Sequence, residues 1–468
     1  MRISETIERS GYFWLPGNDT HKAPGTLRIS DGGNVSLEIV GSFSGPTGSL
    51  KDLDADHDIE RIIGHIEKAG LITLEKCFYT KRPYSFGGIV KSQISVNWAV
   101  LGVAFEAHEK IEFDTYHAWI EGLDHWVGLN GITTTYSDDW TNFTVEYHKP
   151  NAIRLLETDD VQVEVQFGFT MPSGTDLAAT VINHNASLKV VTRDLHTHDY
   201  FTRIVGRLKE FLSFALDETV TITSATAYNR TITDHDGGGE SRAARMEIFV
   251  GFINHPDMPP KLALTRRLFE HRDVAANVDD IITCWLALYD SIGPALNLYF
   301  ATKAGAHKFL ESRFLSLAQA LETLHRRTSD ETVMPPKTYA EVVDAVVGAC
   351  PAEHADWLKQ KLTYGNEISL SRRIKVLLRR FPKQFGSKSE RARLAQMIAD
   401  TRNYLTHFDE ALSEKAARKR KLWVLCLKME ALLQLHLLAT LHFSDEQISA
   451  ICSKLVLSQK LKMTFSEG

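Results

Sequence analysis

The segment Asp400–Asp409 carries an arginine and a histidine, side chains that can together bind a phosphate and transfer protons near neutral pH. Arg402 is followed by Asn403, and His407 comes five residues after the arginine. The 2′-hydroxyl of RNA can attack the neighbouring phosphate when a histidine transfers protons near neutral pH and a cation stabilises the phosphate. A guanidinium suits phosphate oxygens better than an ammonium, because its planar fork donates two parallel hydrogen bonds. We therefore predict that Arg402 and His407 are catalytic and that Asn403 holds the phosphate or orients His407. The predicted products are a 2′,3′-cyclic phosphate and a 5′-hydroxyl.

The R-x4-H spacing alone is weak evidence, and its context has to decide. It occurs at Arg193–His198, Arg230–His235, Arg266–His271 and Arg402–His407. The first two lie in strand-like runs, and the third lacks a small polar residue after the arginine. The fourth combines a helical pattern, the adjacent asparagine and a basic region of the chain, so it is the one that we select.

A helix is expected to present this motif. The residues Ser387 to Glu390 have the form of a capping box, in which a serine and a glutamate satisfy each other's backbone amides at a helix start. The apolar residues that follow would face inward: Leu394, Met397, Ile398 and Leu405.

Arg402 and His407 would not point the same way on a straight helix, because five residues rotate by roughly 140°. Either the helix bends between them, or two subunits bring two motifs together across a twofold axis. We favour a homodimer or higher homo-oligomer. The apolar helix expected at Leu422–Leu441 would contribute to such an interface or serve as a central core helix, and both alternatives remain open.

Other residues are supporting candidates. Glu322, beside the apolar stripe of the helix expected within His307–Arg327, is either a buried partner for Arg402 or a surface glutamate, and Tyr404 lies inside the motif. Four arginines at helical repeats either follow an RNA backbone or form a solvated face: Arg372, Arg373, Arg379 and Arg380. These arginines are expected on the face opposite Leu370, Ile374 and Leu377. The run Arg418–Lys421 is interpreted as a basic cluster flanking a helix rather than a specific reader.

Charge is divided unevenly along the chain. Residues 301–468 hold 27 Lys and Arg against 18 Asp and Glu, a net +9, which leaves 26 against 41, a net −15, in residues 1–300. A polyanion such as RNA would therefore be attracted to the C-terminal part.

The secondary-structure pattern changes in the same region. From Tyr12 to about Ile253, short alternating runs rich in β-branched and aromatic residues indicate strands, with one helix at Ile204–Phe214. After Asp279 the apolar spacing becomes helical. We predict an α+β chain of two domains. Residues 1–290 form a mainly β domain, a sandwich or barrel-like sheet, and residues 300–468 form an all-α bundle.

Several classes of protein are disfavoured. Five scattered cysteines without a C-x-x-C pair argue against disulfides and zinc knuckles, and no cofactor or metal is predicted. Charged residues interrupt the apolar stretch Leu422–Leu441, so no membrane span is expected. The loop Asp234–Gly239 is interpreted as an exposed hairpin. The N-terminal residues lack the core of a secretory signal, so a cytoplasmic location is expected.

Several segments resemble one family, the ApeA-like HEPN proteins. Gly11–Pro16, Pro24–Leu27 and Val35–Ile39 look like the start of the ApeA N-terminal domain, while Phe314–Glu322 and Thr401–His407 look like its HEPN domain. The resemblance implies a bacterial antiphage endoribonuclease that cleaves host RNA, with tRNA as the foremost candidate. Arg402 and His407 match the catalytic positions of the family.

The same resemblance implies an N-terminal sensor or regulatory domain that responds to a phage-derived trigger. The alternative is a HEPN bundle without catalytic activity, which binds nucleic acid or a partner while the β domain recognises a ligand.

Overall fold

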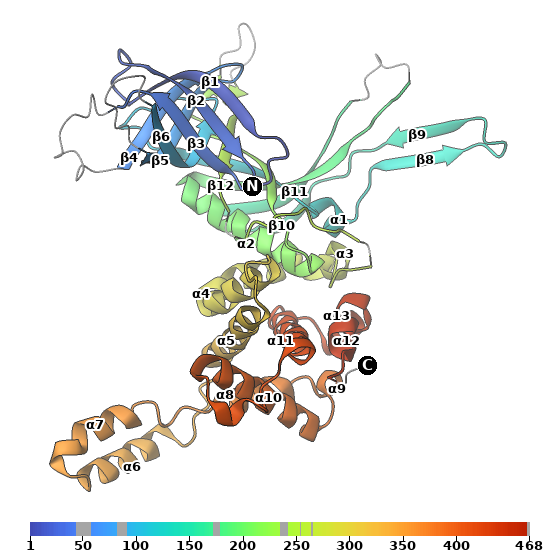
Figure 1. Ribbon diagram of the computed structural model, residues 1–468. Coiled ribbons are helices and arrows are strands. Elements are labelled where there is room, and N and C mark those ends of the chain that lie inside the picture. Colours follow the sequence, from blue (N-terminus) through green and yellow to red (C-terminus); the bar gives the residue numbers. More distant parts are fainter. Residues whose placement is uncertain are drawn as a thin grey trace. The chain divides into compact units, whose positions relative to one another are not determined.

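The chain divides into two compact units, residues 1–286 and 287–468, and the division falls inside helix α4 (Val278–Lys303). The computed structural model describes residues 1–43, 58–81, 91–171, 178–234, 242–252, 254–263 and 265–465. The first unit is mainly β and the second is helical (Figure 1). The predicted fold class is therefore confirmed. The predicted loop Asp234–Gly239 lies largely outside the described residues.

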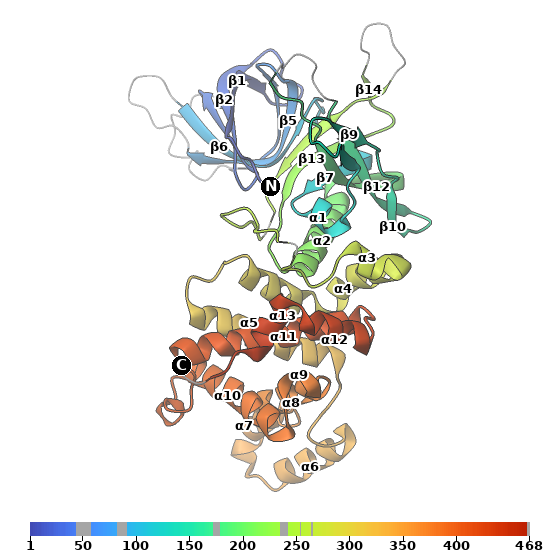
Figure 2. The same ribbon diagram turned by 90° about the vertical axis from the view of Figure 1, so that its right-hand side faces the viewer.

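Six antiparallel strands of the first unit close into a barrel. Its strands are β1 (Ile7–Trp14), β2 (Ala23–Ser30), β3 (Asn34–Val40), β4 (Asp58–Ile66), β5 (Gly70–Lys81) and β6 (Lys91–Leu101). They follow the order β6-β3-β2-β1-β4-β5, and the pairing of β5 with β6 completes the ring seen in Figure 2. Closure leaves no free edge within this ring.

The barrel closes tightly around Phe13, whose side chain is fully buried. Two strand glycines permit this, because a Cβ on Gly64 would lie 2.6 Å from the Phe13 ring and one on Gly25 would lie 2.5 Å from the Glu38 carbonyl oxygen. Glycine within a strand marks such close approaches. The neighbouring Trp14 is also buried, so the aromatic pair belongs to the core.

The sheet continues beyond the barrel from β6 in the order β16-β13-β7-β12-β11-β10. These strands are β7 (Glu112–Ile120), β10 (Ile153–Glu157), β11 (Val161–Phe169), β12 (His184–Thr197), β13 (Ile222–Tyr228) and β16 (Met246–Val250). Helix α2 (His198–Leu216) packs on β12 and β7 and contains the helix predicted at Ile204–Phe214. The minor elements are α1 (Leu123–Val127), β8 (Ile132–Tyr136), β9 (Phe143–Tyr147), β14 (Thr233–Asp234), β15 (Arg242–Ala243), α3 (His271–Val274) and the 3-10 turn η2 (Ala275–Asn277).

The second unit is a bundle around one buried helix, α11 (Lys419–Thr440), which packs against α5, α8, α12 and α13. The other helices are α5 (Leu310–Thr328), α6 (Pro336–Gly348), α7 (Ala352–Leu362), α8 (Leu370–Arg379), α9 (Pro382–Phe385), α10 (Lys388–His407), α12 (Asp445–Ser453), α13 (Leu455–Lys462) and the 3-10 turn η3 (Glu410–Leu412). Most of α11 is buried within this unit, as a central core helix requires.

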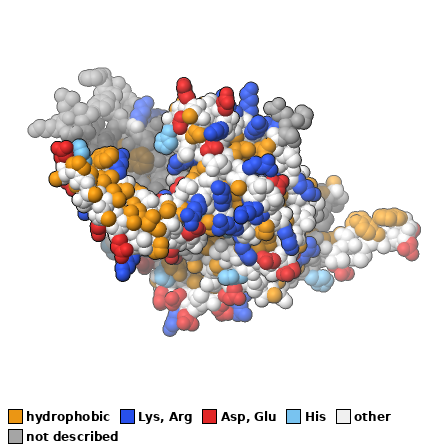
Figure 3. Space-filling model, turned by 90° about the horizontal axis from the view of Figure 1, so that it is seen from below, with side chains coloured by type: hydrophobic (Ala, Val, Ile, Leu, Met, Phe, Trp, Pro, Cys, Tyr) orange, Lys and Arg blue, Asp and Glu red, His pale blue; other side chains and the backbone are white. Residues whose placement is uncertain are grey.

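Helices α6 and α7 pack on each other and form an arm that extends from the bundle (Figure 1). Neither helix contains a fully buried residue. Val342, Val346 and Trp357 are exposed, and the arm shows a run of hydrophobic side chains in Figure 3. Lys and Arg side chains gather at the centre of the same view.

Two helical segments are long and apolar enough to cross a membrane, His271–Lys303 and Lys419–Thr440. The core helix of a bundle has the same length and composition as such a span. In Lys419–Thr440, 72% of the apolar window is buried inside the protein.

Candidate active site

Helix α10 presents the R-x4-H motif on its last two turns. The predicted capping box is confirmed: the Ser387 hydroxyl accepts from the Glu390 amide, and the Glu390 carboxylate accepts from the Ser387 amide. The helix ends where Phe408 takes a left-handed conformation, with φ of 53°. His407, the last helical residue, is exposed, and Arg402 is half-buried.

The competing R-x4-H matches do not share this arrangement. Arg193 lies in β12, whereas His198 begins α2 and stacks on Trp98 with 4.0 Å between ring centroids. Burial lowers the pKa of His198 to about 4. Arg266 precedes α3, and His235 lies outside the described residues. Among described residues, Arg402 and His407 are the match carried by a single helix.

Arg402 is positioned from two sides. Its Nη1 donates to Oδ1 of Asn403 at 3.2 Å, and its Nη2 lies 4.0 Å from Oε2 of Glu322 on α5. The Arg402 side chain is 36% exposed, so it keeps access to solvent beside this carboxylate. The structure thus places Asn403 and Glu322 beside Arg402. The sequence left Glu322 as either a buried partner or a surface glutamate, and its side chain, 21% exposed, is half-buried.

Glu322 is shared between two arginines. Its Oε1 accepts from Nε and Nη2 of Arg326, one turn along α5, at 3.3 and 3.2 Å. Arg326 also pairs with Glu367 at 2.5 Å, and the hydrogen bond from Arg326 lowers the pKa of Glu367. A chain of ion pairs therefore runs from Glu367 through Arg326 and Glu322 to Arg402. Arg326 and Glu367 were not singled out from the sequence, because their link to the motif depends on helix packing.

Replacing Glu322 by glutamine is expected to reduce RNA cleavage by about 3- to 10-fold, because a half-exposed ion pair contributes roughly 0.5–1.5 kcal/mol. The amide keeps the shape of the side chain but removes the charge beside Arg402. Steady-state kinetics should show the loss mainly in kcat. Glu353→Gln on α7, an exposed carboxylate remote from this chain of ion pairs, is the matched control. An unchanged rate in Glu322→Gln would show that Arg402 does not depend on this partner.

The four arginines of the predicted RNA-following face do not share one face. Arg373 is 4% exposed, and its guanidinium contacts Nδ1 of His325 and the Glu367 carboxylate, both at 3.3 Å. The prediction that Arg373 lies on an outer surface is therefore wrong. Its position three residues after Leu370 and four before Leu377 places it on the apolar side of α8.

The other three arginines of this set are exposed. Arg372 pairs with Glu331 at 2.6 Å, and Arg380 pairs with Asp445 at 3.1 Å. Arg379 is exposed beside them on α8. For these three, contact with RNA stays a prediction.

Tyr404 lies on the other side of α10 from Arg402 and contacts Arg418. Nη2 of Arg418 donates to the Tyr404 hydroxyl at 3.0 Å, and its guanidinium carbon lies 5.2 Å from the centre of the Tyr404 ring. The amide of Ala417 donates to Oγ1 of Thr401 at 2.9 Å. No sequence pattern predicts these contacts, which join the end of α10 to the residues before α11 across the intervening loop.

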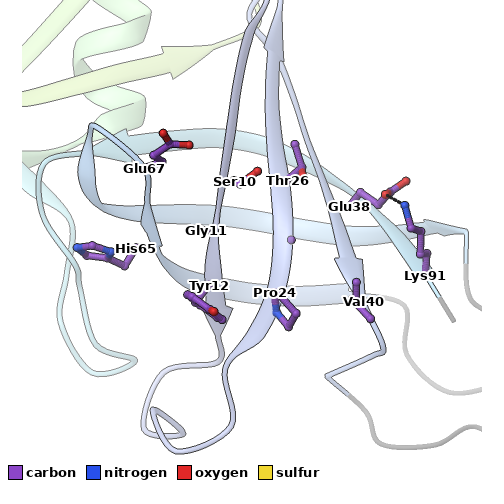
Figure 4. A pocket seen from close by; sticks show the side chains of 11 residues that line it. Ser10, Gly11, Tyr12, Pro24, Thr26, Glu38, Val40, His65, Glu67 and Lys91 are labelled. Atoms are coloured by element: carbon purple, nitrogen blue, oxygen red, sulfur yellow. Dashed lines mark hydrogen bonds and ion pairs between the residues drawn. The ribbon is translucent and has the colours of Figure 1, made fainter. Parts of the chain in front are cut away.

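The first unit has a hollow of about 540 Å³ on the outside of the barrel. His65 and Glu67 lie on one side of it, the Glu38–Lys91 ion pair lies on the other, and Tyr12 projects between them (Figure 4). Tyr12 is 57% exposed. The hollow offers an aromatic ring and both signs of charge to a ligand.

In the part of the chain that the structure describes, no group of three or more His, Cys, Asp and Glu side chains is arranged to hold a metal ion. His196 stacks on Tyr200 at 4.1 Å, and His198 stacks on Trp98, so the segment His196–Asp199 uses its two rings in packing.

A β unit with a closed barrel, followed by a helical unit that carries R-x4-H on one helix, defines a two-domain protein with a HEPN-type bundle. Family models match both parts: ApeA N-terminal domain 1 over residues 8–285 and Apea-like HEPN over residues 315–447. The chain belongs to the ApeA family. No curated protein and no solved structure matches it. The HEPN match supports a nuclease-type antiphage protein.

Proposed function

We propose that the protein is a metal-independent endoribonuclease whose site is built on Arg402 and His407, with Asn403 as a third member. The observation that carries this proposal is the placement of both residues on the last turns of α10, with His407 exposed and Arg402 beside the Glu322 carboxylate. The positive charge of residues 301–468 favours a polyanionic substrate.

The proposed reaction uses the RNA's own 2′-hydroxyl as nucleophile. Its oxygen forms a bond to the adjacent phosphorus, and the bond from phosphorus to the 5′-oxygen breaks. His407 transfers the proton between the attacking and leaving oxygens, and Arg402 stabilises the charge on the phosphate. The products carry a 2′,3′-cyclic phosphate and a 5′-hydroxyl.

Two copies are proposed to complete the site. Arg402 and His407 are separated by roughly 140° around the axis of α10. The helix is continuous from Lys388 to His407, without non-helical residues between the two. A twofold arrangement that faces two α10 ends would place Arg402 of one copy near His407 of the other. The oligomer is thus a homodimer, or a higher homo-oligomer, formed through the HEPN domain.

In the cell, the proposed role is abortive infection in the cytoplasm, with tRNA as the foremost candidate target. The domain formed by residues 1–290 acts as sensor of a phage-derived trigger, and the hollow beside Tyr12 is its candidate recognition surface. Trigger binding there would raise the activity of the HEPN domain above a low basal rate, which the protein keeps without the trigger.

Incubation of the purified protein with total RNA and with tRNA in EDTA tests the nuclease. We expect RNA cleavage that persists in EDTA. A phosphatase should remove the terminal phosphate of the products only after acid has opened the 2′,3′-cyclic phosphate. Cuts that EDTA abolishes would overturn the metal-independent chemistry. RNA binding without cleavage, together with no toxicity on expression, would instead favour a HEPN protein that binds nucleic acid without catalysis.

A further inference from the structure

Arg418 is held in one orientation at the start of α11. It is the residue that precedes the helix, and its backbone is extended, with φ of −133° and ψ of 158°. Its Nη2 donates to the Tyr404 hydroxyl at 3.0 Å and to the Ser413 hydroxyl at 2.7 Å. The guanidinium also covers the Tyr404 ring. Because these contacts restrict the rotamers of a long side chain, the fold fixes the direction of the Arg418 guanidinium.

One buried hydrogen bond fixes Arg418 relative to the motif. The Ala417 amide donates to Oγ1 of Thr401, and both residues are buried. Thr401 directly precedes Arg402, and Ala417 directly precedes Arg418. The backbones of the two arginines are therefore registered against each other across the segment 408–417.

Arg418 lies on the His407 side of α10. At about 100° per residue, Tyr404 is roughly 60° from His407 around the helix axis and roughly 160° from Arg402. Because Arg418 covers Tyr404, its positive charge lies on the side of α10 that carries His407, away from the side that carries Arg402. Each copy of α10 thus has a cation on both sides of its last turns.

The partners of Arg418 leave its charge uncompensated. Arg326, Arg372, Arg373, Arg380 and Arg402 each lie within 4.0 Å of a carboxylate. Among the residues that the structure describes, Arg418 has hydroxyl partners and no carboxylate within that distance. The nearby Asp409 carboxylate accepts from the Ala411 amide instead. An oriented guanidinium without a counter-charge suits a phosphate.

An aromatic ring lies next to this cation. Phe408 is 74% exposed, and its ring centre lies 5.4 Å from that of Tyr404. A fixed cation next to an exposed aromatic ring is the combination that binds single-stranded nucleic acid, with the phosphate on the cation and a base on the ring.

We propose that Arg418 is an RNA-binding residue of the active site, which holds a backbone phosphate of single-stranded RNA on the His407 side of α10 while Tyr404 positions it. This role rests on the proposed nuclease function and adds a second phosphate contact to the one made by Arg402. The basic run Arg418–Lys421 is then more than a helix-flanking cluster, because its first residue is directed at the site.

A comparison of Arg418→Ala with Arg420→Ala tests this role. Both residues are exposed, belong to the same basic run and lose one positive charge, so only their placement differs. We expect kcat/KM on tRNA to fall about 10- to 100-fold in Arg418→Ala, through a raised KM, because a charge-assisted hydrogen bond to phosphate is lost. Arg420→Ala should change it by less than about 3-fold. Tyr404→Phe, which keeps the ring but removes the hydroxyl, should show a smaller change in the same direction as Arg418→Ala.

Binding of a 2′-O-methylated oligoribonucleotide, which cannot be cleaved, provides the second measurement. Across a range of salt concentrations, Arg418→Ala should reduce the slope of log affinity against log salt by about 1. Arg418→Lys should recover part of the affinity, because it restores the charge but not the fork. Equal effects of Arg418→Ala and Arg420→Ala in a wild-type protein that cleaves RNA would overturn the proposal and leave the nuclease intact. A wild-type protein that neither binds nor cleaves RNA would overturn both.

Discussion

Replacement of His407 by alanine is expected to reduce RNA cleavage by about 10²- to 10⁴-fold, the range that removal of a general acid or base produces. His407 is the exposed last residue of α10, and its side chain makes no hydrogen bond or ion pair with another residue that the structure describes. Binding of the 2′-O-methylated RNA should therefore remain within about 3-fold of wild type. The measurement is a single-turnover cleavage rate on tRNA, followed by gel separation of the products.

Replacement of Arg402 should also lower the cleavage rate, because the charge on the phosphate loses a stabilising donor. Arg402→Ala should lower the cleavage rate by about 10²- to 10³-fold, as loss of one stabilising donor does in other enzymes. Arg402→Lys should remain well below wild type, since an ammonium cannot reproduce the fork at a phosphate. For His407→Ala, the matched control is His354→Ala, which removes an exposed histidine of α7 and so measures any general effect of losing an imidazole. A full rate in His407→Ala would remove the histidine from the mechanism.

Mixing the two inactive variants separates a shared site from a single-chain site. When Arg402→Ala and His407→Ala chains form mixed dimers, a composite site receives Arg402 from one chain and His407 from the other. Up to about a quarter of wild-type activity should then return, because half of randomly mixed dimers contain one of their two sites intact. A site formed within one chain would stay inactive in every mixture, and the proposed twofold arrangement would fall.

The helical elements around the site follow from local sequence. The capping box at Ser387 and the apolar stripe expected within His307–Arg327 depend on neighbours within one or two turns, and both occur as predicted. On α5 this stripe buries Phe314, Leu317 and Leu321. The barrel is harder to predict. Alternation indicates strands, but the closing pairing of β5 with β6 and the pairing of β1 with β4 join strands whose register depends on the whole sheet.

The side-chain contacts of the site depend on packing that the sequence does not display. Arg373 sits on the apolar side of α8 because His325 and Glu367 from other segments satisfy its guanidinium there. Arg418 turns back to α10 because Ala417 is tied to Thr401 across a loop. The basic run Arg418–Lys421 does not indicate the hydrogen bond between Ala417 and Thr401. The pairing of Glu322 with Arg402, 80 positions apart in the sequence, is equally hard to predict.

Glu430 joins several helices of the bundle through buried charge. Its side chain is 1% exposed on α11, and its carboxylate contacts Arg313 of α5 at 2.7 Å, Lys460 of α13 at 2.8 Å and Lys303 of α4 at 3.2 Å. Burial alone would raise the pKa of Glu430, but the three cations together hold it well below its usual value. Since α5 carries Glu322 and α11 follows Arg418, these contacts also support the geometry of the site.

Replacing Glu430 by glutamine is expected to destabilise the helical unit by about 3–5 kcal/mol, because it removes the buried negative charge that three neighbouring cations share. Hydrogen exchange of peptides from α11 and α5 measures this unit separately from the β unit. Glu414→Gln, an exposed carboxylate of the same unit, should leave the exchange unchanged. Equal protection in Glu430→Gln and wild type would mean that the cations reach water or other partners without Glu430.

Acid should reveal the same interaction without a mutation. A carboxylate whose pKa is lowered on folding contributes stability above its unfolded value, and that contribution is lost as the pH falls. The ordinary value of a glutamate is 4.5, so wild-type α11 should keep its protection near neutral pH and lose it progressively below that value. Glu430→Gln has no such group to protonate, so the difference in stability between the two proteins should shrink as the pH falls. A difference that stays constant down to strongly acidic pH would show that folding does not lower the pKa of Glu430. The ion cluster between α4, α5, α11 and α13 would then contribute packing rather than charge.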